Sequence, residues 1–146
     1  MAELLLLATI DGQDVVIRSD QVESVVDIGP VTPVPRALRA VRGLAALRSR
    51  VVTVIDTGIA LDPAAVAPPR RRAVVTRVEG HYYALLLDRL NDVAEFPVLP
   101  LTPGLVLDPR WAQVADAMIE RDGHPILLID LPAVIARATG ERRSAA

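Results

Sequence analysis

A chain of 146 residues is long enough for one domain, or for two small lobes that share a core, without disulfide or metal staples. Hydrophobic residues make up 51% of the chain and aromatic residues only 3%, so the core must be aliphatic, which suits a mainly β fold. The net charge of −2 excludes the strongly basic surface of a general nucleic-acid-binding protein, and no apolar run reaches the roughly 18 residues of a membrane-spanning helix.

The first predicted element is a hairpin. Two apolar runs, residues 4–10 and 15–17, flank Asp11-Gly12, a dipeptide that tolerates the positive φ of a tight turn. The acidic Glu3 stands where a signal peptide would have basic residues, so we interpret this start as a strand. Since the chain has no cysteine for disulfides, we expect a cytoplasmic protein.

The next segment is predicted to be irregular. Ser19 is expected to cap a short helical turn, and three prolines within 29–35 predict an extended strap on the surface. Residues 36–42 carry apolar side chains three positions apart between arginines, which indicates one amphipathic helical turn. A basic turn then leads into a buried strand over 51–55.

The middle of the chain predicts a connection followed by new strands. Residues 62–72 contain three prolines and no periodicity, so we interpret them as an exposed connection between two lobes, with solvated arginines at 70–72. Apolar runs at 73–78 and 82–87 predict a second hairpin, and 90–96 a further strand.

The last third of the sequence is ambiguous at one place. Residues 111–119 match a helix template, but Asp122-Gly123 lies between apolar segments at the spacing of a hairpin. We favour the hairpin, with its second strand over 126–129. A final helix over 131–138 is expected to begin after an aspartate cap and to end at Gly140, with a frayed tail beyond.

Several stretches resemble, in order and spacing, the CheW-like family of chemotaxis adaptors. Residues 41–56 are similar to the family signature Gly-Val-x-Asn-Leu-Arg-Gly-x-Val-x-Pro-Val-x-Asp. Residues 82–93 are similar to its Val-Gly-Leu-x-Val-Asp-x-Val-x-x-Val segment, and the pieces at 21–26, 32–35 and 126–131 also agree. The resemblance therefore covers nearly the whole chain.

The resemblance implies a single domain over 1–146, made of two SH3-like β-barrel lobes packed together with short helices. It implies a noncatalytic adaptor without cofactor or metal, which couples chemoreceptors to the histidine kinase CheA. The partners would be the cytoplasmic tip of a chemoreceptor, held in a groove between the lobes, and the regulatory domain of CheA. Neither nucleic-acid binding nor direct membrane insertion is implied, and the adaptor would be recruited to membrane receptor arrays.

The resemblance also implies which residues bind the receptor. Arg48 stands where the family places its receptor-facing arginine, whose planar guanidinium can hold carboxylates or carbonyls at a helix tip. Val22, Ser24, Leu47 and Val74 complete the expected receptor-binding set. The aliphatic members of this set are also candidates for plain core residues.

The sequence departs from the family pattern at four positions. Ala46 and Ser49 replace the signature Asn and Gly, Thr53 replaces the strand Pro, and Ser24 replaces a common Glu. A non-glycine residue at positive φ costs on the order of 1 kcal/mol, so Ser49 could alter the turn. These departures leave open a CheW-like scaffold that serves a kinase pathway other than chemotaxis.

One motif suggests an enzyme of a different class. Asp56-Thr57-Gly58 follows two apolar residues, as in the catalytic loop of retropepsin-like aspartic proteases, where two subunits bring together two carboxylates that share a proton. However, the later apolar runs at 84–88 and 126–130 end in Asp, where such a protease needs Gly. We therefore favour a simpler interpretation, in which Asp56 closes the signature strand.

Overall fold

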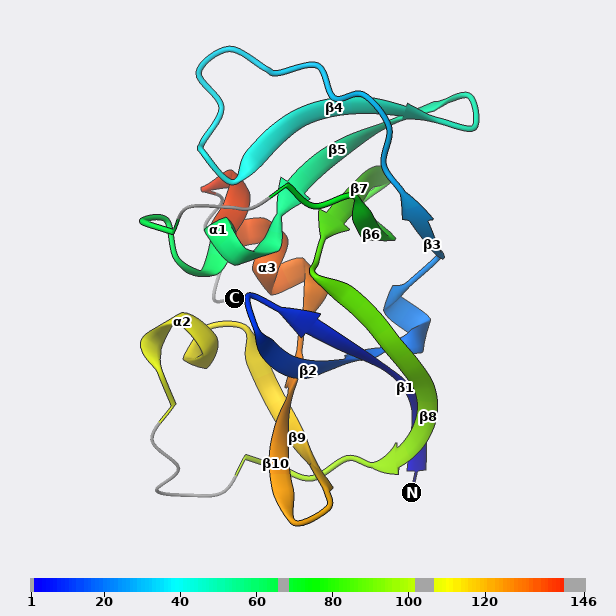
Figure 1. The fold of residues 1–146 in the computed structure, drawn as a ribbon, viewed down its shortest axis with the longest axis vertical. Coiled ribbons are helices and arrows are strands. Elements are labelled where there is room, and N and C mark those ends of the chain that lie inside the picture. Colours follow the sequence, from blue (N-terminus) through cyan, green and yellow to red (C-terminus); the bar gives the residue numbers. More distant parts are fainter. Residues whose placement is uncertain (1, 66–68, 102–106, 141–146) are drawn as a thin grey trace.

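The computed structural model describes residues 2–65, 69–101 and 107–140 and shows two lobes packed against each other (Figure 1). Each lobe is built on a five-stranded sheet. The mainly β fold with two lobes and few short helices, expected from the sequence, is therefore confirmed.

Lobe A is the lower lobe in Figure 1. In order across its sheet, the strands are β8 (Arg89–Pro97), β1 (Ala2–Ile10), β2 (Gln13–Arg18), β10 (His124–Ile129) and β9 (Ala115–Arg121). In lobe B, the corresponding order is β3 (Ser24–Asp27), β6 (Arg72–Val78), β7 (His81–Leu86), β5 (Arg50–Asp56) and β4 (Val41–Leu47).

The helices are short. They are a 3-10 turn η1 (Ser19–Gln21), α1 (Thr57–Leu61), α2 (Pro109–Ala112) and α3 (Leu131–Thr139). None of the helices in the described part of the chain is both long and apolar enough to span a membrane. The predicted cap at Ser19 is wrong, because Ser19 is itself the first residue of η1 and no side chain caps this turn.

The final helix agrees with its prediction. The Asp130 side chain accepts a hydrogen bond from the Ala133 backbone N–H at 3.2 Å, which satisfies one of the free donors at the start of α3. Gly140 follows the helix at φ 75, the left-handed conformation that glycine adopts most easily. The tail predicted to fray beyond Gly140 lies outside the described residues.

Lobe B is inserted into lobe A along the chain. Its five strands all lie between residues 24 and 86, whereas lobe A takes two strands from before this segment and three from after it. The prediction that residues 62–72 join the lobes is therefore wrong: the described part of this segment leads from α1 to β6 within lobe B. The chain crosses between the lobes after β2 and after β7.

Two-residue turns close four hairpins, and in each turn both residues have positive φ. The turns are Asp11-Gly12, Arg48-Ser49, Glu79-Gly80 and Asp122-Gly123. This conformation matches the right-handed twist of the flanking strands. The three predicted hairpins, whose turns all contain glycine, are confirmed, including the one that competed with a helix over 111–119.

The fourth hairpin corrects the prediction around the signature stretch. Residues 36–42 were expected to form a helical turn, but no helix occurs there and Val41 begins strand β4. A single pair of apolar residues three positions apart is too short a pattern to distinguish a helix from a strand. A strand forms instead because β4 pairs with β5 along its length, from Val41 with Ile55 to Leu47 with Arg50.

Three apolar cores hold the two lobes. One lies inside each lobe, and the largest lies between them, where residues of both sheets meet all three α-helices. Trp111, the only tryptophan, is buried in this interlobe core and serves as a packing anchor. The opposite faces of each strand therefore serve different cores, which decides where the candidate site residues point.

Candidate functional site

Three of the five expected receptor-binding residues come together at one end of lobe B. Ser24, Leu47 and Arg48 line a pocket of about 180 Å3 with Glu23, Val26, Arg50 and Val75. Strand pairing explains this: Ser24 faces Val75 across β3 and β6, and Leu47 faces Arg50 across β4 and β5. We call this pocket the Arg48 pocket. All of its lining residues lie between residues 23 and 75, so it belongs to lobe B rather than to a groove between the lobes.

The other two expected residues lie elsewhere. Val74 is fully buried in the interlobe core, and Val22 is partly buried against the same core. Because successive side chains of a strand point to opposite faces, Val75 reaches the Arg48 pocket and Val74 cannot. The family resemblance pointed to β6, a strand that borders the pocket, but it did not fix which of the two neighbouring valines faces the pocket.

Arg48 itself is exposed in the tip of the β4–β5 hairpin, at φ 48. In the part of the chain that the structure describes, its guanidinium has no ion pair or hydrogen bond. A planar guanidinium offers five N–H donors in a fixed arrangement that fits carboxylates. The pocket therefore presents a free cation beside the apolar side chains of Leu47, Val26 and Val75.

Arg50 is held differently, although it is only two residues away. Its guanidinium lies 4.1 Å from the centre of the Tyr82 ring and 3.5 Å from a carboxylate oxygen of Glu23. Arg77 lies on the same ring at 5.6 Å. These contacts make Arg50 part of the pocket wall. Sequence reasoning missed Arg50 and Tyr82, because the pairing of β5 with β7 brings them together and no local motif signals it.

At the opposite end of β5, the Asp56 carboxylate is buried and fully engaged. Its Oδ1 accepts a hydrogen bond from the Ile59 backbone N–H at 3.1 Å and so caps α1. Both of its oxygens also accept from Arg70 Nη1, each at 3.1 Å. An aspartic protease needs a carboxylate that faces a second one and shares a proton with it. This geometry favours the structural role of Asp56 that we expected.

Arg70 was expected to be a solvated linker residue, and this is wrong. Its side chain is 6% exposed, and besides Asp56 it binds Asp88 through Nε at 2.6 Å and approaches Asp11 at 3.8 Å. These aspartates belong to three places: the end of β5, the crossing after β7, and the β1–β2 turn of lobe A. Arg70 therefore ties the two lobes together. A proline-flanked arginine run gives no sequence signal for this, since its partners are far away in the chain.

The charges of this cluster shift the pKa values of its members. Burial alone would raise the pKa of Asp88, but hydrogen bonds from the Gly12 backbone N–H and from Arg70 outweigh it and hold this pKa below its usual value. Burial likewise works against the charge of Arg70, yet the hydrogen bond to Asp88 and the charge of Asp56 raise its pKa. Both ions are thus stabilised in the folded state.

Comparisons with known proteins agree with this architecture. The chain is 25% identical over 130 residues to the chemotaxis protein CheW of Thermotoga maritima, an alignment that covers 89% of this chain and 85% of that protein. The crystal structure of the scaffolding protein TtCheW from Thermoanaerobacter tengcongensis has the same fold, with a TM-score of 0.74 at 17% identity over 89% of this chain and 90% of the other. The sequence model of the CheW-like domain matches residues 4–139, and the chain therefore belongs to the CheW-like domain family.

Proposed function

We propose that this protein is a noncatalytic cytoplasmic adaptor that couples chemoreceptors to the histidine kinase CheA within membrane receptor arrays. The receptor would contact Arg48, Ser24 and Leu47, with Val22 supporting the site from the edge of the interlobe core. Val74 is left out of the contact surface because it is fully buried. The regulatory domain of the kinase would bind another surface of the lobes.

The observation that carries the receptor proposal is the free guanidinium of Arg48 beside an apolar pocket. The tip of a helical hairpin offers carbonyl oxygens and acidic side chains next to aliphatic ones, so it complements both parts of the site. The neighbouring Arg50 cannot replace Arg48, because Tyr82 and Glu23 already hold it. The affinity of a single contact of this size is modest, but an array that holds the partners together raises their effective concentration.

A second candidate keeps the adaptor mechanism and changes the pathway. Ser24 lies in the Arg48 pocket where the family often has Glu, and Ser49 stands in the turn where the family has Gly. The pocket therefore lacks one negative charge that many relatives would present. A partner other than a chemoreceptor, in a kinase pathway with a different output, would fit such a change.

The experiment that tests the proposal is a pull-down from lysate of the native source, with retained proteins identified by mass spectrometry. Wild type is compared with Arg48→Glu, which reverses the charge at the pocket. The matched control is Arg121→Glu, because Arg121 is exposed, unpaired among the described residues and adjacent to the Asp122-Gly123 turn of another hairpin.

We expect wild type and the Arg121→Glu control to retain a histidine kinase together with chemoreceptors, and Arg48→Glu to lose the receptors but keep the kinase. Equal recovery of receptors by all three proteins would show that Arg48 is not the contact. Recovery of a kinase with a different class of sensor would favour the second candidate. Absence of any histidine kinase would contradict the adaptor proposal itself.

A further inference from the structure

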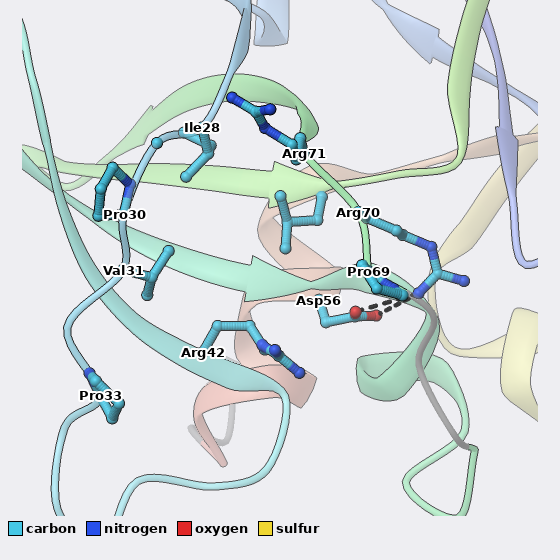
Figure 2. A pocket seen from close by; sticks show the side chains of 11 residues that line it. Ile28, Pro30, Val31, Pro33, Arg42, Asp56, Pro69, Arg70 and Arg71 are labelled. Carbon is cyan, nitrogen blue, oxygen red and sulfur yellow. Dashed lines mark hydrogen bonds and ion pairs between the residues drawn. The ribbon is translucent and has the colours of Figure 1, made fainter.

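A second pocket lies at the end of lobe B opposite to the Arg48 pocket. It has a volume of about 500 Å3, within the range of binding pockets in proteins. Figure 2 shows the strap after β3, with Pro30, Val31 and Pro33, on one side of this pocket, and Pro69 and Arg70 on the other. We call it the strap pocket. Its walls are mostly apolar, whereas three of its lining residues are arginines.

The charge of the strap pocket is opposite to that of the whole chain. Three arginines and one aspartate line it, although the chain as a whole carries a net charge of −2. Asp56 is already paired with Arg70 at its buried end. Arg42 and Arg71 remain exposed, and neither guanidinium forms an ion pair or hydrogen bond with another described residue. The two free cations thus make the opening of the strap pocket complementary to an acidic partner.

A β-bulge in the backbone sets the direction of one of these cations, Arg42. Between Val41 and Gly43 the register of β4 against β5 shifts, so Arg42 is the extra residue of a β-bulge. A bulge redirects a side chain that would otherwise follow the strand alternation. In Figure 2 the Arg42 side chain extends across the lower part of the pocket, and Arg71 lies on the upper side. A ligand that meets both must therefore be extended rather than compact.

The strap also offers free backbone donors. The N–H groups of Gly29 and Val31 form no hydrogen bond with another described residue. On either side, the Ile28 N–H donates to the backbone carbonyl of Arg71, just before β6, and the Thr32 N–H donates to Leu44 in β4. Extended peptides bind such unpaired main-chain groups by adding a short strand-like contact. Prolines at positions 30 and 33 restrict the strap, so little conformational entropy is lost on binding.

We propose that the strap pocket binds a short, extended segment of a partner protein that carries acidic side chains next to aliphatic ones. The acidic groups pair with Arg42 and Arg71, and the aliphatic groups pack on Pro30, Val31 and Leu86. A nucleotide fits less well, because no aromatic side chain among the described residues lines the pocket to stack on a base. This site is separate from the Arg48 pocket and does not depend on the receptor proposal.

The test starts from a random heptapeptide library displayed on phage and selected on the immobilised full chain at low ionic strength. Selected peptides are synthesised, and their affinities are measured by fluorescence anisotropy for wild type and for the double variant Arg42→Gln/Arg71→Gln. The matched control is Arg89→Gln/Arg121→Gln, which removes two exposed arginines of lobe A whose side chains have no partner among the described residues. Arg48→Glu serves as a second control for the other pocket. Thermal unfolding checks that all variants fold.

We expect the selected peptides to combine Asp or Glu with Leu, Ile or Val. Their affinity should fall about tenfold in Arg42→Gln/Arg71→Gln, because two partly exposed charge pairs are lost, and should remain unchanged in both controls. The NMR amide signals of Gly29 and Val31 should shift when peptide is added.

Three results would overturn the proposal. The first is an empty selection, or peptides without acidic residues. The second is equal loss of affinity in the lobe A control or in Arg48→Glu, which would indicate nonspecific or misplaced binding. The third is displacement of the peptides by millimolar inorganic phosphate, together with the same NMR shifts at Gly29 and Val31 when phosphate alone is added. This would identify a small-anion site.

Discussion

The hairpin turn that carries Arg48 is strained, whereas the other three hairpin turns relieve the same strain with glycine. Arg48 and Ser49 have φ values of 48 and 68, and the equivalent second turn positions are Gly12, Gly80 and Gly123. A side chain at positive φ costs about 1 kcal/mol relative to glycine. The protein tolerates this cost at the turn where a guanidinium is displayed.

Replacing Ser49 with glycine should therefore stabilise the protein by about 0.5–1 kcal/mol. The free energy of unfolding, measured by urea denaturation, checks this. The reverse change, Gly80→Ser, is the matched experiment, because a Cβ at Gly80 meets no atom within 4 Å and only its φ of 81 matters. It should destabilise by a similar amount. If Ser49→Gly were no more stable than wild type, the positive φ of Ser49 would not destabilise the turn.

At the scale of single residues, the sequence predicted three residues that line the Arg48 pocket and missed other features for a physical reason. Arg48 was predicted because a local motif carries it. Val74 was assigned to the pocket but faces the core. Two adjacent valines give no alternation of polar and apolar residues that would show which of them points to which face of the strand. Arg70 was missed because its burial depends on aspartates in three distant segments. Local patterns cannot reveal such long-range partners.

At the scale of elements, Gly43 holds the strap against β4. The Thr32 backbone N–H donates to Leu44 O at 2.8 Å, and the Leu44 N–H donates to Thr32 O at 2.9 Å. Gly43 has φ 140, and a Cβ at this position would lie 2.1 Å from Thr32 O. The strap can approach β4 this closely only because residue 43 has no side chain.

Gly43→Ala should destabilise the protein by about 2 kcal/mol, because the strap must move or the two strap hydrogen bonds must stretch. Urea denaturation measures the loss. The matched control is Gly29→Ala in the same strap, where a Cβ meets nothing within 4 Å and φ is not positive, so stability should hardly change. An equal loss in both variants would mean that the close approach at Gly43 is not what matters.

Arg70→Gln should be among the most destabilising single changes, by about 3 kcal/mol, because it leaves the buried Asp56 carboxylate without its cation. Arg72→Gln is the control two residues away. Its pair with Asp27, at 3.3 Å, has side chains that are 48% and 56% exposed, and such exposed pairs contribute less than about 1 kcal/mol. Similar losses in the two variants, measured by thermal or urea unfolding, would contradict the buried role of Arg70.

The elements themselves were predictable where turn chemistry and apolar runs agreed. The hairpins around Gly12, Gly80 and Gly123 were found because glycine marks each turn. The β4 strand was missed because its turn, Arg48-Ser49, has no glycine, and because its start lies in an arginine-rich stretch. The order of strands across the sheets was also beyond local reasoning, since β2 pairs with β10 and β5 with β7 by contacts that are distant in sequence.

At the scale of the whole molecule, the Arg70 cluster makes the junction of the lobes sensitive to acid. The pKa of Asp88 is lower in the folded state than its ordinary value, so its contribution to stability is present above that ordinary value and is lost as the pH falls through the folded one. The usual pKa of an aspartate is about 3.9, so the loss should occur below about pH 4.

Comparing wild type with Asp88→Asn tests this acid sensitivity. At neutral pH the variant should be less stable, because the hydrogen bonds from Gly12 and Arg70 to a charged acceptor are weakened. The difference in the free energy of unfolding should shrink as the pH is lowered from about 5 to about 2. A difference that stays constant over this range would show that the Asp88 charge does not stabilise the fold.

The insertion of lobe B into lobe A also sets an order of assembly during synthesis. A ribosome completes every strand of lobe B by residue 86, when lobe A has only β1 and β2. Lobe B can therefore fold while it emerges, but β1 must wait for β8 and β2 must wait for β10. During this interval the leucine run 4–7 is uncovered, so the nascent chain is most prone to aggregate through its first strand, long before its last strand is made.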